Sequence, residues 1–184
     1  MKFSVKTQLF TILVLCVCYF AGIVFLTHRY KTCSIHHQSE FCKYFSVLRD
    51  QKNRYSVFVV AKEDAGSALN CSAVIAMQHF GLKQPLKEGK GRAYFALVEN
   101  GAVCREILAA NENDRIVQDG TLKDFEWQVE SAGNTEGAVA SVKINGKEVA
   151  LNHRGLNIVV CDDHGAVKDS VCFDTSAKGL KCSR

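Results

Sequence analysis

This chain of 184 residues has little proline and a small net charge, and it lacks repeated segments. The sequence has no internal repeat and no low-complexity tract, and its one proline is Pro85. Setting aside Lys2 and Lys6, which precede a long apolar run, leaves 21 of the 23 basic residues against 19 acidic residues. A net charge of about +2, and no basic run interleaved with aromatic residues, argue against a nucleic-acid partner.

The apolar run near the N-terminus spans Leu9–Leu26 and carries no charged residue. As a helix it measures about 27 Å, just enough for the ~30 Å hydrocarbon layer of a membrane. We therefore expect a short basic tail at 1–8, a transmembrane signal anchor at 9–27 and a polar stalk at 28–38. A cleaved signal peptide is the alternative, but the run is long for one and lacks the paired small residues of a cleavage site. The remaining residues suit one domain and would be cramped as two.

Cysteine is abundant, with nine residues, of which Cys16 and Cys18 fall within the apolar run. The density in the rest of the chain is typical of an oxidising compartment, so we expect an extracytoplasmic C-terminal domain: lumenal, periplasmic or extracellular. Because seven cysteines follow the run, at least one thiol is free or pairs between chains. Cys161, on an apolar strand, is our candidate for a buried free thiol. The seven are Cys33, Cys42, Cys71, Cys104, Cys161, Cys172 and Cys182.

Apolar spacing and turn residues predict an α+β domain dominated by antiparallel sheet, with two helices. The helices are expected at 39–49 and at 69–80, the second ending at Gly81. Two Asn-Gly pairs predict hairpin turns. The stretch 111–124 is polar, acidic and glycine-containing, and we interpret it as a linker. Strands are expected at 55–61, 93–98, 103–108, 125–131, 139–144, 147–151, 156–161 and 167–173.

Several short motifs together resemble the ILEI/PANDER (interleukin-like EMT inducer) family. The pieces are Arg154-Gly-Leu-Asn157, Phe173-Asp-Thr175, the apolar strand ending at Asp64, and the strand that begins at Arg92. The family includes secreted cytokine-like proteins and the stem domain of the O-mannose N-acetylglucosaminyltransferase. In that family the first two pieces precede the others, whereas here they follow them.

The resemblance therefore implies one circularly permuted domain at 39–177. Residues 39–110 would be the second half of the family domain and 125–177 the first half, joined by the new linker at 111–124. Residues 178–184 would be a tail. The chain departs from the family pattern at Ala93, Tyr94 and Phe95, where the family has an acidic residue and a tryptophan.

The permutation also implies that the segment after Thr175 lies near the start of the first helix. Cys182 is then expected to pair with Cys33 or Cys42, and Cys71 with Cys104 is a second candidate pair. The family's sugar-binding branch implies a ligand site made by Arg154, Asp64 and Arg92, because carboxylates accept from sugar hydroxyls and guanidinium groups donate to sugar oxygens. The alternative is an Arg-Asp ion pair that only fixes loops.

Other polar groups have simpler interpretations. Asn70-Cys-Ser is an N-glycosylation sequon. Cys33, His36, His37 and Cys42 lack the spacing of a zinc site, so we expect no metal and no cofactor. Asp162-Asp-His164 suits a hairpin turn better than acid-base chemistry.

These observations predict a single-pass membrane protein whose outer domain recognises a carbohydrate or a glycoprotein and is not an enzyme. Its contact with the lipid bilayer would run through residues 9–27. The alternative is a protein-binding module for signalling or assembly, like the cytokine-like branch of the family. A hydrolase or thiol enzyme remains a third hypothesis, because resemblance transfers fold better than function.

Overall fold

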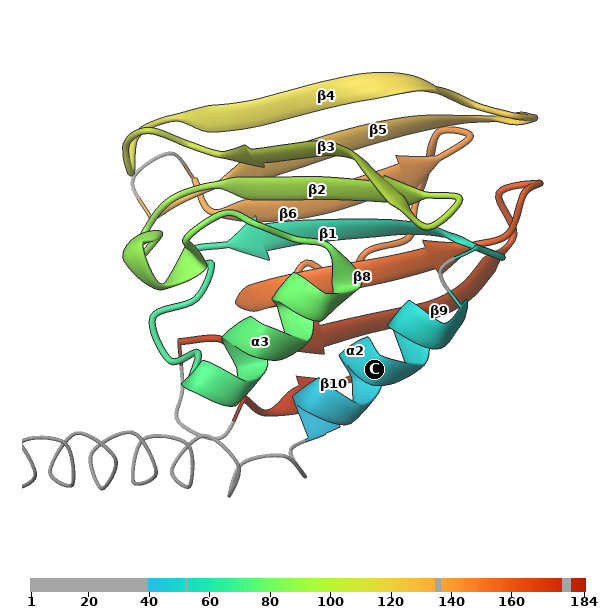
Figure 1. Ribbon diagram of the computed structural model, residues 1–184. Helices are drawn as coiled ribbons and strands as arrows, with labels where there is room; N and C mark the ends of the chain where they lie inside the picture. The colour runs from blue at the N-terminus through green and yellow to red at the C-terminus, as the bar shows by residue number, and fades with distance from the viewer. Residues whose placement is uncertain (1–39, 52, 135–136, 177–179) are drawn as a thin grey trace, which may run out of the picture. The chain divides into compact units, whose positions relative to one another are not determined.

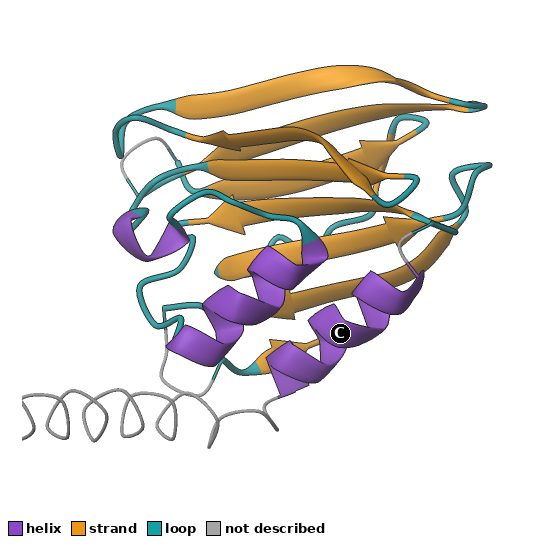
Figure 2. Ribbon diagram, in the orientation of Figure 1, coloured by secondary structure: helices purple, strands orange, loops and turns teal. Residues whose placement is uncertain are grey.

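The computed structural model describes residues 40–51, 53–134, 137–176 and 180–184. The expected basic tail, anchor and stalk, with Cys33, lie outside these residues. Within the described residues, no helix has both the length and the apolar character needed to cross a membrane. The four segments form three layers, with two helices on one face of a six-stranded sheet and a four-stranded sheet on its other face (Figures 1 and 2).

Both sheets are antiparallel throughout, which confirms the predicted α+β class. The larger sheet has the order β10-β9-β8-β1-β2-β3 and the smaller one β4-β5-β6-β7. The elements are α2 (Glu40–Gln51), β1 (Ser56–Lys62), α3 (Cys71–Phe80), the 3-10 helix η1 (Leu86–Glu88), β2 (Tyr94–Glu99), β3 (Ala102–Leu108), β4 (Arg115–Leu122), β5 (Phe125–Ala132), β6 (Val139–Ile144), β7 (Lys147–Glu148), β8 (Gly155–Cys161), β9 (Val167–Phe173) and β10 (Cys182–Ser183).

Strand β1 lies between the two hydrophobic cores. Val57 and Val59 face the helices, whereas Phe58 and Val60 face the smaller sheet, and all four are fully buried. This confirms the burial on both faces that the apolar run predicts. Burial of each such side chain contributes about 1.5–3 kcal/mol to the free energy of folding. Strand β1 therefore stabilises the packing of the helices on one face and of the smaller sheet on the other.

Both predicted helices are present, with α2 ending two residues later and α3 beginning two residues later than expected. In α2, Phe41, Phe45 and Leu48 recur at helical spacing and are buried against the larger sheet. In α3, the side chain of Asn70 caps the first turn by accepting from Ala73 N, and Gly81 ends the helix with φ 117°. That positive φ explains the glycine, because other L-residues rarely adopt it.

Residues 111–124, expected to be a linker, instead contain strand β4. The linker prediction is wrong because β4 is an edge strand whose inward positions hold only two apolar residues, Ile116 and Leu122. Gly120 pairs with Trp127 and faces inward beside its indole. A Cβ at this position would lie 2.9 Å from the indole, so a glycine is needed there. The polar and glycine content therefore reflects an edge position and a bulky neighbour.

Part of the expected tail at 178–184 is a strand of the larger sheet. Cys182 and Ser183 form β10 and pair with Phe173 and Cys172 of β9. Figure 1 shows β10 beside α2, at the end of the helix where it begins. The carboxylate of Glu40, the first residue of α2, lies close enough to the Cys182 thiol to accept a hydrogen bond from it. The end of the chain thus meets the start of the first helix.

Candidate functional site

Arg154 lies in the turn that leads into β8, and the glycine and asparagine that follow it at the start of β8 hold it at the surface. Gly155 has φ 104°, and a Cβ there would lie 2.1 Å from the carbonyl oxygen of Phe173. Asn157 is fully buried; its Oδ1 accepts from His153 N at 3.0 Å, and its Nδ2 donates to His153 O at 2.7 Å. The turn is therefore fixed on both sides of Arg154, which begins the approach to β8.

Arg154 pairs with Asp174, the residue after β9. Its Nη2 lies 2.9 Å from Asp174 Oδ2, and the two side chains are 52% and 24% exposed. Burial raises the pKa of Asp174, but hydrogen bonds from Arg154 and Ser176 outweigh it and bring that pKa below its ordinary value. The pair is ionised near neutral pH, and the guanidinium keeps further N–H groups for a ligand.

Asp64 serves its own loop. Its carboxylate is almost completely buried: Oδ1 accepts from Gly66 N at 2.9 Å and from Ser67 N at 2.8 Å, and Oδ2 accepts from Ser67 Oγ at 2.5 Å. Its backbone oxygen accepts from Thr175 Oγ1 at 2.6 Å. Asp64 therefore orders the loop after β1 and ties it to the segment that carries Asp174.

The loop containing Arg92 reaches the same end of the sheet. Lys90 forms an isolated bridge with Asp64, two residues before Arg92. Gly133 packs so closely here that a Cβ on it would lie 1.8 Å from the carbonyl oxygen of Gly91. Arg92 itself is half-buried.

The structure thus brings the three expected ligand residues to one end of the larger sheet. Lys62, at the end of β1, pairs with Gly155, so Asp64 and Arg154 lie near each other. Asp64 and Glu63 are both close enough to raise the pKa of Arg154 further, although Asp174 is the main cause. We call Arg154, Asp174, Asp64 and Arg92 the Arg154 edge. The sequence alone does not single out Asp174, which belongs to this edge, or Asn157, which fixes the turn that carries Arg154. Both residues nevertheless lie within the motifs that resemble the family.

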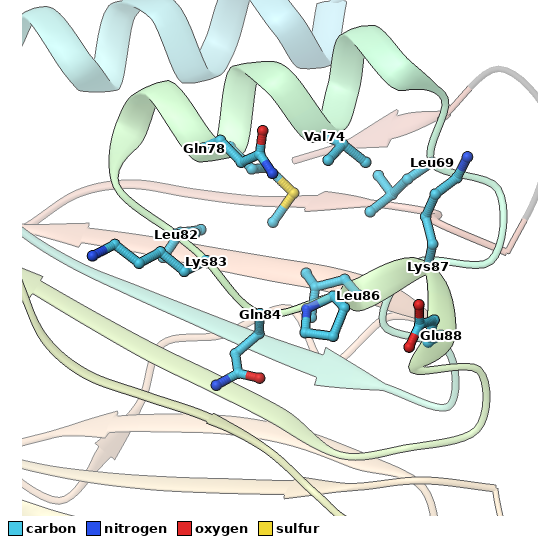
Figure 3. Close-up of a pocket in the computed structure, with 11 residues that line it drawn as sticks. Leu69, Val74, Gln78, Leu82, Lys83, Gln84, Leu86, Lys87 and Glu88 are labelled. Atoms are coloured by element: carbon cyan, nitrogen blue, oxygen red, sulfur yellow. The ribbon is translucent and has the colours of Figure 1, made fainter.

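A separate cavity of about 250 Å³ lies between α3 and η1 (Figure 3). The backbone N–H groups of Lys83 and Gln84 hold its wall by donating to the carboxylate of Glu106. Its volume is below the ~300–1,000 Å³ of ordinary ligand sites, and apolar residues make up about half of its lining. These apolar residues are Leu69, Val74, Met77, Leu82, Pro85 and Leu86.

The cysteine predictions have different outcomes. Cys161 is a fully buried free thiol, as predicted, and burial raises its pKa to about 12. The Cys71–Cys104 pairing is wrong: both are free and exposed, and Cys71 begins α3 whereas the other end of that helix meets β3 at Val103. A helix of this length spans about 15 Å, too far for a disulfide. Cys182 forms no disulfide with Cys42 in the structure, so that pairing is wrong, and its other proposed partner, Cys33, lies outside the described residues.

The remaining candidates have structural roles. Asn70 Oδ1 is occupied as the cap of α3. Asp162 Oδ1 accepts from the N–H groups of His164 and Ala166, which confirms the predicted turn role. His164 pairs with Asp124 at the surface. Among the described residues, no group of three or more His, Cys, Asp or Glu side chains could hold a metal ion.

Comparison with known proteins gives no further assignment: no family model, no curated protein and no solved structure matches this chain.

Proposed function

We propose that this protein is a membrane-anchored, extracytoplasmic recognition module that binds a carbohydrate or a glycosylated partner at the Arg154 edge. The domain would be a circularly permuted ILEI/PANDER-like domain, held by an anchor at residues 9–27. The observation that carries the binding proposal is the partly exposed Arg154–Asp174 pair on a rigidly fixed turn.

The arrangement of strands supports the permutation. In the family order the segment carrying Phe173-Asp-Thr175 runs directly into the helix that corresponds to α2. The structure joins these elements in space, because β10 follows that segment and lies beside Glu40. In addition, β8 from the C-terminal half pairs along its whole length with β1 from the N-terminal half. Two halves that share a central strand pair form one domain.

The chemistry of the Arg154 edge suits a sugar. A carboxylate beside a guanidinium offers acceptors and donors at adjacent positions, and vicinal hydroxyls of a sugar can use both. Asp174 is the carboxylate available for this role, because its side chain is 24% exposed whereas Asp64 is almost completely buried. Asp64 would then position the edge, and Arg92 would contribute a second guanidinium at the same end of the sheet.

A glycan array probed with the full chain in detergent tests the proposal. We expect binding that is lost in Arg154→Ala and in Asp174→Asn, with an unchanged midpoint of thermal unfolding. The matched control is Arg49→Ala, because Arg49 is an exposed arginine in the last turn of α2 that, like Arg154, pairs with an aspartate. Its replacement should leave sugar binding unchanged.

Binding that survives the loss of Arg154 would refute the proposed site. No binding to any glycan, together with capture of a defined protein partner, would favour the alternative of a protein-binding signalling or assembly module. Turnover of a substrate that disappears on replacement of one Cys or His would refute both.

A further inference from the structure

Four strands form the edges of the two sheets, and within the described part of the chain one of them is unprotected. An edge strand presents unpaired N–H and C=O groups, and proteins blunt such edges by short strands or bulges. Strands β7 and β10 have two residues each, and β3 carries a register irregularity opposite Leu97 and Val98. In contrast, β4 has eight residues and pairs with β5 in regular register from Arg115 to Leu122. Figure 1 shows β4 as the outermost strand of its sheet.

The outward side chains of β4 form a short self-complementary sequence. Arg115, Val117 and Asp119 alternate on the face away from the other sheet, and all three are exposed. Val117 is 61% exposed, more than any other exposed large hydrophobic residue in the described part of the chain. These three residues are basic, apolar and acidic, at equal spacing. When two such strands run in opposite directions, the basic residue of each faces the acidic residue of the other, and the two apolar residues face each other.

We propose that β4 pairs antiparallel with β4 of a second copy of this chain, about a two-fold axis beside Val117. The two four-stranded sheets would join into one continuous eight-stranded sheet. Val117 would face Val117 of the partner subunit, and Arg115 would face Asp119 of the partner subunit on each side. This inference does not depend on the Arg154 edge or on sugar binding.

Symmetry leaves few alternative registers. In an antiparallel pair, two facing residues either both direct their N–H and C=O groups toward the partner strand or both direct them away from it. Neighbouring residues of one strand differ in this direction, so a residue can face its own copy but not the copy of its neighbour. The two-fold axis must therefore pass beside a residue, not between two residues. An axis at Asp119 would set two carboxylates against each other, which is unfavourable. An axis at Gln118 would set Val117 against a carboxylate. Only the axis at Val117 satisfies the apolar residue and both charges.

The existing contact of Arg115 is compatible with this pairing. Arg115 forms an ion pair with Glu130 on β5, the neighbouring strand. A guanidinium has five N–H groups and can donate to a second carboxylate at the same time. Glu130 would therefore help to hold Arg115 on the outward face for its partner.

Two charge reversals test the proposal in the full chain in detergent. Arg115→Asp sets like charges opposite each other across the axis, and so does Asp119→Arg. We expect each variant alone to dimerise about tenfold more weakly than the unchanged chain in sedimentation equilibrium. An equimolar mixture of the two should recover dimer, because each reversed charge then meets its complement. A mixture that remains monomeric, or an unchanged chain that does not dimerise, would overturn the proposal.

A cross-link gives an independent test of register. Facing Cα atoms in an antiparallel pair lie about 4.5–5.5 Å apart, within disulfide range. In a background with Cys71→Ser and Cys104→Ser, Val117→Cys should yield a covalent dimer on mild oxidation. The matched control is Thr121→Cys, which is also exposed on the same face but distant from its copy in this register. Equal cross-linking at both positions would contradict the two-fold axis.

Discussion

Replacing Asn157 with Asp should make the stability of this protein fall as the pH rises. The change keeps the side chain's shape but exchanges the Nδ2 donor for an oxygen, which then faces His153 O at 2.7 Å and Gly155 O at 3.4 Å. Only the protonated acid can donate to these carbonyl groups. Because the site is fully buried, the pKa of the new carboxyl should rise well above its unfolded value of about 3.9.

The size of the effect follows from the pKa shift. A rise of about two to three pKa units corresponds to roughly 3–4 kcal/mol, at about 1.4 kcal/mol per unit. A raised folded pKa stabilises the variant below the unfolded pKa, and this contribution is lost as the pH rises through the folded pKa. The penalty should therefore be small near pH 4 and reach its full value by about pH 8.

Urea unfolding followed by the fluorescence of Trp127 measures this penalty, since Trp127 is the single tryptophan and is 4% exposed. Asn157→Ala serves as the control: it removes the same hydrogen bonds and should cost about 2–3 kcal/mol at every pH. A penalty in Asn157→Asp that is the same at pH 4 and pH 8 would refute the reasoning. The turn that carries Arg154 would then not depend on the asparagine donor.

Three further outcomes can be measured. Asn70→Ala should lower the free energy of unfolding by about 1 kcal/mol because α3 loses its cap to Ala73 N, whereas Asn70→Ser should keep most of it. Hydrogen bonds from Lys168 and from backbone N–H groups lower the pKa of Asp162 to about 2. The stability difference between the unchanged chain and Asp162→Asn should therefore be constant above about pH 5 and shrink as the pH falls from about 4 to 2; a constant difference at pH 2 would contradict this. In native protein a maleimide should label Cys71 and Cys104 rapidly and Cys161 only after unfolding, and rapid native labelling of Cys161 would contradict its burial.

Much of the fold can be predicted from the sequence because its signals are local. Both helices, the hairpin turns at the Asn-Gly pairs and the doubly buried strand β1 depend on residues that are close together in the chain. Strand β10 could not be found this way. Two residues have no periodicity of their own, and β10 exists because β9 offers it an edge.

The candidate site could be predicted only in part. The sequence motifs place Arg154, Asp64 and Arg92 at the ends of strands, and the fold brings these ends together. Which carboxylate faces Arg154 depends on loop geometry. The turn after Asp64 directs two backbone N–H groups at its own carboxylate, so Asp174 becomes the partner. The sequence does not indicate that Asp174, instead of Asp64, pairs with Arg154.

The error at 111–124 and the proposed dimer have the same physical origin. An interior strand must be apolar on one or both faces, and such strands are easy to find in a sequence. A strand at an open edge needs only enough inward apolar residues to stay attached, which for β4 are Ile116 and Leu122. Its outward residues are free to be polar, so the strand resembles a linker. The arrangement of Arg115, Val117 and Asp119 is nevertheless ordered and is left exposed on a regular strand. The features that conceal β4 in the sequence are therefore those that suit it to pair with its own copy.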